Sequence, residues 1–195
     1  MFITRLAKDR QMFRRILATP EDEAKQLPGD ELIDNPSMVI DSSFELPASP
    51  AEVYPWFLQL GKKRAGWYFT RFTEKFFFPS ARGIRHIDQK WQDLKVGDRI
   101  PDYGKDGYFD CFYVEKNKAI GYTSTRGKVT MTWVLTFWKS ETGTRVIIRL
   151  RATGFKSRNR AFMSIGKLFD RLTISWLAAG LRERLTDREY YSSSK

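Results

Sequence analysis

Residues 46–61, which decide the fold, read LPASPAEVYPWFLQLG. Ser49 can cap a helix, Pro50 suits the first helical position, and Glu52 stands at the third. Apolar side chains then recur at helical spacing until Gly61 provides a stop. The stretch therefore predicts a short helix that begins at Pro50 and buries an aromatic-rich face.

The residues around this helix predict an antiparallel sheet. Residues 38–46 alternate between apolar and polar side chains, which is typical of a strand that leads into the helix. A second short helix is expected over 67–78, ended by Pro79. From Gly97 onward the period changes to two, and Thr-rich or Arg-rich faces alternate with apolar ones. Strands are expected at 108–115, 119–124, 129–138 and 145–152, with a hairpin turn at 141–144. Both faces of 108–115 carry aromatics, so its inward register stays open.

Helical patterns stand near both ends of the chain. Residues 160–186 carry a wide apolar stripe, which predicts one long helix packed across the sheet. Residues 2–17 predict a short amphipathic helix with a basic face, and a further helix is expected to start at Thr19-Pro20. The basic face contains Arg5, Lys8, Arg14 and Arg15.

Composition limits the function classes. The chain has 195 residues, 42% of them apolar and 29% charged, as expected for one globular domain. A single cysteine excludes an intrachain disulfide and favours a reducing, cytoplasmic setting. No apolar run reaches the ~18 residues of a membrane span. The net charge of +11 favours anionic partners.

Catalytic and metal motifs are missing from the sequence. His86 is the one histidine, so a triad or a histidine metal site would depend on it alone, and pairing with Cys111 is a remote alternative. No glycine-rich phosphate loop exists, and nucleic-acid binding is not expected. Acidic residues that recur every fourth position are interpreted as turn chemistry rather than a calcium loop. They are Asp98, Asp102, Asp106 and Asp110. We therefore expect no catalytic site, metal or cofactor.

Three short sequence motifs carry a family resemblance. VYPWFLQLG at 53–61, RAGWY at 64–68 and WQDLKVGD at 91–98 resemble a branch of the START-like superfamily. This branch comprises the bacterial polyketide cyclase/dehydrase and lipid-transport proteins, also called SRPBCC proteins. The resemblance covers about residues 19–186. It implies an α+β helix-grip fold, with a curved antiparallel sheet of about six or seven strands around the long C-terminal helix and two short helices after the first strand.

The resemblance also divides the chain into segments. Residues 1–30 would form an amphipathic, helical extension, where many relatives carry hydrophobic transmembrane segments. Residues 31–188 would form the START-like domain, and residues 189–195 a disordered tail.

Aromatic residues make up 15% of the chain and are the best functional signal. A helix gripped by a curved sheet leaves an internal void, so we expect an aromatic-lined cavity for a small hydrophobic or lipid-like ligand. Tyr108, Trp133 and Trp91 are expected to orient the ligand. The full expected lining is Trp67, Tyr68, Phe72, Phe76, Trp91, Tyr108, Phe112, Trp133, Phe137 and Trp176.

Two alternatives to simple binding stay open. The resemblance allows a polyketide cyclase or dehydratase, which would need a polar cluster of Tyr, Arg and Asp in the pocket. The basic segments 2–17 and 145–189 allow peripheral docking on an anionic membrane. The sequence specifies neither the ligand nor the oligomeric state.

Overall fold

The computed structural model describes residues 16–78, 80, 82–102, 107–155 and 160–187, with side chains described from Leu168 onward in the last range. The tail at 189–195 lies outside the described residues. So does the helix expected over 2–17, apart from its last two residues, and so do Arg5, Lys8, Arg14 and Arg15. The expectations for these segments stay predictions.

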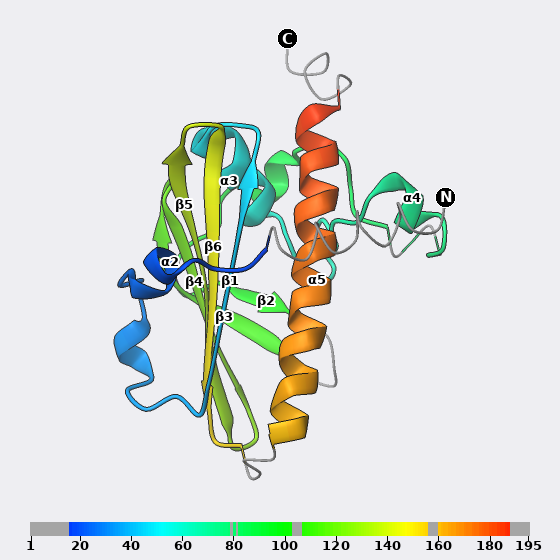
Figure 1. Cartoon of the computed structure of the whole chain (residues 1–195). Helices are drawn as coiled ribbons and strands as arrows, with labels where there is room; N and C mark the ends of the chain where they lie inside the picture. Colours follow the sequence, from blue (N-terminus) through cyan, green and yellow to red (C-terminus); the bar gives the residue numbers. More distant parts are fainter. Residues whose placement is uncertain (1–15, 79, 81, 103–106, 156–159, 188–195) are drawn as a thin grey trace, which may run out of the picture.

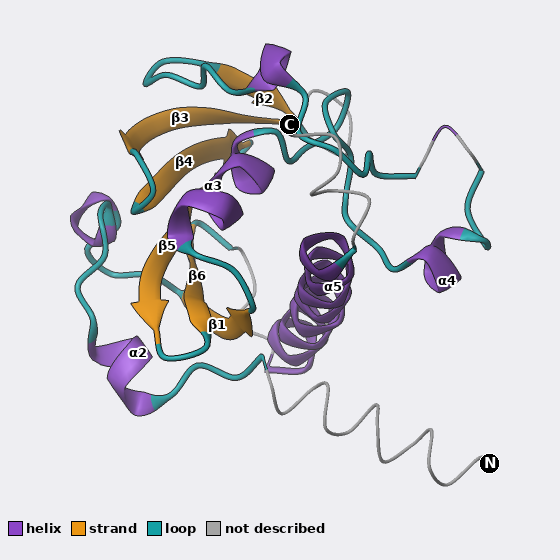
Figure 2. Ribbon diagram, turned by 90° about the horizontal axis from the view of Figure 1, so that it is seen from above, coloured by secondary structure: helices purple, strands orange, loops and turns teal. Residues whose placement is uncertain are grey.

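Six strands form one antiparallel sheet in the order β1-β6-β5-β4-β3-β2. Seen from above, the sheet bends into an arc whose concave side faces the long helix α5 (Figure 2). The predicted sheet and its hairpin connections are confirmed. The strands are β1 (Met38–Leu46), β2 (Arg99–Pro101), β3 (Tyr108–Glu115), β4 (Ala119–Arg126), β5 (Val129–Ser140) and β6 (Gly143–Thr153).

Helix α5 (Arg160–Thr186) runs along the open side of this sheet (Figure 1). It buries Ile174, Leu177 and Leu181 in one core with Phe44 of β1 and Ile148 of β6. The α+β helix-grip fold is thus confirmed, with the long helix at the predicted bounds. Among the described residues, no helix combines the length and the apolar character needed to cross a membrane.

Helix α3 (Pro50–Leu58) begins as the sequence predicts. The Glu52 carboxylate accepts hydrogen bonds from the Ser49 backbone N–H at 2.9 Å and the Ser49 hydroxyl at 2.7 Å. These contacts satisfy a donor that the first helical turn leaves without a partner. The helix places Trp56, fully buried, and Phe57 over one end of the sheet.

The second helix after β1 is shorter than expected. We predicted a helix over 67–78, but α4 covers only Arg71–Glu74. The Thr70 hydroxyl accepts a hydrogen bond from the Thr73 N–H and starts the helix there. Residues 67–69 do not join the helix because Tyr68 packs against the α5 backbone, where a Cβ on Gly180 would lie 2.5 Å from the Tyr68 carbonyl oxygen. Tertiary contact therefore overrides the helical spacing.

A β-bulge decides the register of β3. Cys111 lies on the concave side and Phe112 on the convex side. The pairing with β4 then shifts between Cys111 and Tyr113, so that Tyr113 lies opposite Gly121 and Val114 returns to the concave side. On the convex side, Phe112 packs with Leu27 and Val134, directly over Gly121. An extra residue in one strand reverses the alternation of faces, which explains the aromatics at both parities.

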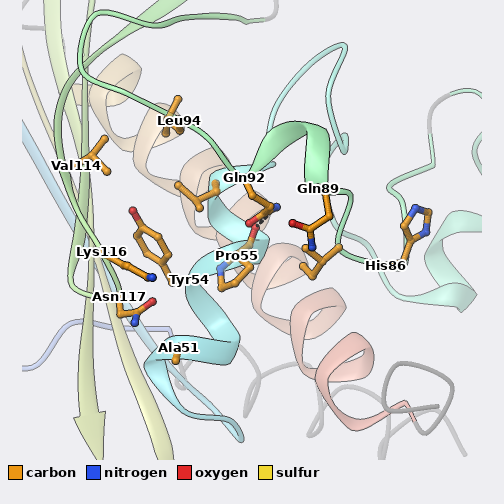
Figure 3. Close-up of a pocket in the computed structure, with 12 residues that line it drawn as sticks. Ala51, Tyr54, Pro55, His86, Gln89, Gln92, Leu94, Val114, Lys116 and Asn117 are labelled. Atoms are coloured by element: carbon orange, nitrogen blue, oxygen red, sulfur yellow. Dashed lines mark hydrogen bonds between the residues drawn. The ribbon is translucent and has the colours of Figure 1, made fainter. Parts of the chain in front are cut away.

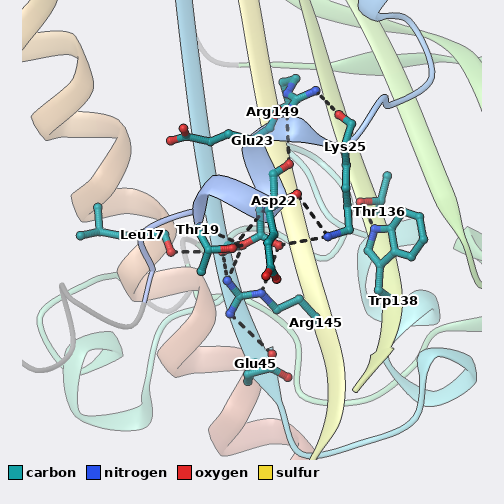
Figure 4. A network of polar contacts seen from close by, with 12 residues as sticks. Leu17, Thr19, Asp22, Glu23, Lys25, Glu45, Thr136, Trp138, Arg145 and Arg149 are labelled. Carbon is teal, nitrogen blue, oxygen red and sulfur yellow. Dashed lines mark hydrogen bonds and ion pairs between the residues drawn. The ribbon is translucent and has the colours of Figure 1, made fainter. Parts of the chain in front are cut away.

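The segment before β1 packs on the convex face of the sheet. It contains α2 (Pro20–Ala24) and η1 (Asp30–Leu32), and Thr19 caps α2 as predicted. Arg145 of β6 pairs with the buried Asp22 and with Glu45, as Figure 4 shows. Burial alone would raise the pKa of the Asp22 carboxyl, but hydrogen bonds from Arg145, Thr19 and Ser43 outweigh burial and hold it well below its ordinary value.

The arginines of β6 bind the segment before β1, and Arg149 is buried. Arg149 donates to Asp41 at 2.6 Å and to Asp30 at 2.7 Å, and Arg151 lies 3.3 Å from Asp30. Part of the basic 145–189 surface that we expected to meet a membrane is therefore used to hold the N-terminal segment on the sheet.

Candidate functional site

A cavity of about 610 Å³ lies between α5 and the concave face of the sheet. Its volume falls within the range of roughly 300–1,000 Å³ that is typical of small-molecule sites. Strands β3, β4, β5 and β6 supply its floor, and α5 and the 60–69 segment supply its walls. The side chains that line it include Trp67, Phe109, Tyr122, Trp133, Leu150 and Asp170.

Four aromatic rings form the centre of the lining. Trp133 lies 6.0 Å from Tyr122 and 6.5 Å from Trp67 in stacked arrangements, and 5.7 Å from Phe109 at a tilted angle. Trp67 is fixed in place because its indole N–H donates to the Thr173 carbonyl of α5 at 3.3 Å. The rings therefore form a preorganised apolar surface for a flat or flexible ligand.

One carboxyl interrupts this apolar lining. Asp170 of α5 lies in the cavity wall, and burial raises the pKa of its carboxyl to about 6, although Arg171 and the nearby Ser42 hydroxyl act in the opposite direction. The Ser42 Oγ is buried on the inner face of β1 and makes no hydrogen bond of ordinary geometry with a described residue. A carboxyl in such surroundings can accept a hydrogen bond from a ligand or exchange a proton near neutral pH.

Tyr122 adds a second polar group. Its ring is buried and lines the cavity, and its hydroxyl has no hydrogen-bond partner among the described side chains and backbone groups. Burial raises the pKa of this hydroxyl well above its ordinary value, so it stays protonated. A protonated phenol hydroxyl can donate a hydrogen bond to an oxygen atom.

Three of the ten expected lining residues meet in the cavity, namely Trp67, Trp133 and Trp176. Two others are buried next to it. Phe137 packs behind the lining residue Phe57 at 5.0 Å. Tyr68 is fully buried, and its hydroxyl donates to the Trp56 carbonyl at 2.8 Å, so its polar group is already used.

The other five expected lining residues lie outside the cavity. Phe72 and Phe76 are exposed on and after α4, and Phe112 packs on the convex face. Trp91 lies under the Arg64 guanidinium at 4.6 Å, and Tyr108 lies under Arg99 at 3.9 Å. Of the three residues expected to orient a ligand, only Trp133 is placed to do so.

Sequence reasoning missed Tyr122, Phe109 and Asp170. A two-residue turn joins Arg126 to Val129, and counting back from that turn pairs Tyr122 with Trp133. The hairpin signal could therefore have found Tyr122. Asp170 stands within the apolar stripe of α5, and a charged residue in an apolar stripe marks a candidate functional residue.

A second hollow of about 1240 Å³ lies between α3, the 86–92 loop and the turn after β3. Its lining is more polar, with Gln89, Gln92, Lys116 and Asn117, and Tyr54 is its one aromatic residue. Figure 3 shows His86 pointing away from the other side chains. We therefore take the aromatic cavity, and not this groove, as the candidate site.

The groups considered for catalysis or metal binding have other surroundings. His86 is exposed in a loop, and burial raises the pKa of the Cys111 thiol to about 11, which leaves little thiolate at neutral pH. Asp102 pairs with Arg126 and Asp110 pairs with Arg99. No group of three potential metal ligands occurs among the residues that the structure describes.

No family model and no curated protein sequence matches the chain. Solved structures do match. A protein of unknown function from Staphylococcus aureus is 14% identical, with a TM-score of 0.52 over 81% of this chain and 96% of that chain. A protein from Mesorhizobium loti is 17% identical, with a TM-score of 0.48 over 77% and 99%. CalU16 from Micromonospora echinospora is 15% identical, with a TM-score of 0.47 over 79% and 80%. The first likeness supports the fold described above, and none of the three assigns an activity.

Proposed function

We propose that the chain binds a small, largely apolar ligand in the cavity beneath α5. The observation that carries this proposal is the cavity itself, whose centre is the ring cluster around Trp133. Burial of ligand carbon against these rings would contribute about 25 cal/mol per Å² before the entropy costs of binding. Tyr122 and Asp170 would orient a ligand that carries both an oxygen atom and a hydrogen-bond donor.

We also infer that the chain belongs to the START-like superfamily. The helix-grip fold and the sequence motifs at 53–61, 64–68 and 91–98 support this inference. The fold by itself does not choose between transport and catalysis, since one fold can support unrelated functions.

Catalysis of a proton transfer in the same cavity is the second candidate function. It is favoured by Asp170, whose pKa of about 6 suits a general acid or base near neutral pH. Tyr122 could stabilise a developing negative charge on a substrate oxygen. Such an activity would fit a cyclase or dehydratase, although no arginine lines the described cavity.

Native mass spectrometry of the purified protein tests the binding proposal. Leu150 of β6 lies in the cavity lining, so Leu150→Trp would fill the space. Val39 of β1 pairs with Arg151 and faces the other side of the sheet, so Val39→Trp is the matched control. We expect a bound apolar molecule in the wild type and the control but not in Leu150→Trp. Equal occupancy in all three proteins would contradict the proposal.

A further inference from the structure

The segment around α4 exposes a cluster of phenylalanines. Phe72 is 56% exposed, Phe76 is 77% exposed and Phe78 is 82% exposed. Helix α4 projects beyond α5, on the side away from the sheet, in both views of the molecule (Figures 1 and 2). The Phe72 and Phe76 rings meet edge-on at 5.6 Å. Single exposed apolar residues are ordinary, but several exposed aromatic residues on one projecting segment mark a contact surface.

In this segment an acidic side chain is buried and aromatic side chains are exposed, which is the reverse of an ordinary water-facing surface. Its acidic residue, Glu74, is buried and pairs with Arg184 at 2.8 Å and with Arg85 at 2.9 Å. Phe72 and Phe76, on either side of Glu74, face solvent. Charged residues are rarely buried unless they are paired. In this segment the paired Glu74 is buried, whereas the aromatic side chains are exposed.

The base of the segment is anchored, which keeps these aromatics exposed. The Arg184 side chain, fully buried, donates to the Phe69 carbonyl at 2.7 Å and to the Gly83 carbonyl at 3.0 Å. Both ends of the segment are therefore tied to α5. Because its ends are held, the segment cannot turn over to bury Phe76 and Phe78 against the domain without breaking these contacts.

The exposed aromatics are continuous with the rim of the cavity. Phe77 stacks on Phe69 at 4.8 Å, and Phe69 meets Trp176 edge-on at 5.7 Å. These three residues all line the cavity. Exposed Lys75 and Arg82 flank the cluster, in a chain whose net charge is +11. Aromatic tips beside basic side chains match the interface of an anionic bilayer, where rings enter the acyl boundary and cations meet the headgroups.

We propose that residues 72–78 dock this protein on an anionic lipid surface, with Phe72, Phe76 and Phe78 at the headgroup–acyl boundary. Docking in this way brings the Phe69–Trp176 rim of the cavity to the membrane. The surface is distinct from the basic segments considered from sequence, and it acts whether or not the cavity holds a ligand.

Vesicle flotation of the full-length protein tests the proposal. The probe is phosphatidylcholine vesicles with or without about 30% phosphatidylserine. The test variant is Phe76→Ser/Phe78→Ser. The matched control, Leu32→Ser/Val96→Ser, also removes two exposed apolar side chains, which lie outside the segment. Circular dichroism confirms that each variant is folded.

We expect the wild type and the control to float with anionic vesicles, and the Phe76→Ser/Phe78→Ser variant to bind at least about tenfold more weakly. Leu150→Trp, which fills the cavity, should float like the wild type, so the result is separable from ligand binding. No flotation of the wild type, or equal flotation of the wild type and the Phe variant, would overturn the proposal. So would a dimer in sedimentation analysis that dissociates in the Phe variant without vesicles, since the face would then join two copies of the chain.

Discussion

Replacing Asp170 by asparagine should stabilise the protein at neutral pH. In the native structure burial raises the pKa of this carboxyl from its ordinary value of 3.8 to about 6. The native state therefore binds more protons than the unfolded state between these two pH values. The free energy of unfolding must therefore fall as the pH rises through that window. Above about pH 7 the carboxyl is fully ionised, and the destabilisation by its buried charge reaches its full value. Asparagine keeps the shape and carries no charge, so it removes the cost.

The magnitude follows from the size of the shift. Each pKa unit corresponds to about 1.4 kcal/mol of differential interaction, so a shift from 3.8 to about 6 has an upper limit of about 3 kcal/mol. Water in the cavity reduces this value. We expect Asp170→Asn to raise the free energy of unfolding by about 1–3 kcal/mol at pH 7.5, with no comparable gain at pH 3.5.

Urea unfolding at the two pH values measures this difference. With a slope of about 1–3 kcal/mol per molar urea, the midpoint should move up by roughly 1 M at pH 7.5. Asp93, whose side chain is 79% exposed, provides the control, because Asp93→Asn should change stability by less than about 0.5 kcal/mol at either pH.

Two results would refute this reasoning. One is an Asp170→Asn protein that is no more stable than wild type at pH 7.5. The other is a gain of equal size at both pH values, which would point to packing and not to charge. A stabilised variant that also binds ligand more weakly would show why the chain retains a costly carboxyl in its cavity wall.

Three further variants probe the contacts that shape the site. Arg184→Met should lower the free energy of unfolding by about 3–5 kcal/mol, because the buried Glu74 keeps only Arg85 as a charge partner and the Phe69 and Gly83 carbonyls lose their donor. Adding Glu74→Gln should restore part of this loss. Asp22→Asn should destabilise the protein by about 1–3 kcal/mol at pH 7. The native pKa of Asp22 lies below its ordinary value, so the stability difference between wild type and variant should shrink as the pH falls below about 4. A destabilisation that does not change with pH would contradict this prediction. Gly180→Ala should lower the free energy of unfolding by about 1–3 kcal/mol, although alanine has the better helix propensity, because the new Cβ would meet the Tyr68 carbonyl. An unchanged melting temperature would contradict this prediction and show that the two backbones can separate.

Local signals predicted most of the fold. The Ser49-Pro50 start of α3 and the Thr19-Pro20 start of α2 depend on hydrogen bonds between residues three apart, which the sequence displays directly. The inward face of β5, with Trp133 and Phe137, follows from strict alternation. The bounds of α5 follow from one long apolar stripe, in which Asp170 is an exception. Each of these elements was predictable because its cause lies within a few residues of itself.

The parts of the site that escaped prediction depend on distant contacts. Phe112 shares the outward face with Tyr113 because of a bulge, which turns Val114 inward and leaves no single parity of β3 inward along its length, and no composition rule marks that bulge. Phe72 and Phe76 carry helical spacing that would suit a buried face, yet the Arg184–Glu74 pair anchors the segment with its aromatics outside. An aromatic residue can serve a core, a cavity or a surface equally well, so its position is decided by the tertiary structure.

A crystal structure of the protein soaked with N-phenyl-1-naphthylamine, a neutral apolar probe, tests the central claim most directly. We predict density for the probe between α5 and the sheet, with its rings against Trp133 and Tyr122 and its N–H directed toward Asp170. A space closed by these side chains, with no density or with the probe only on the exposed 72–78 segment, would contradict the account.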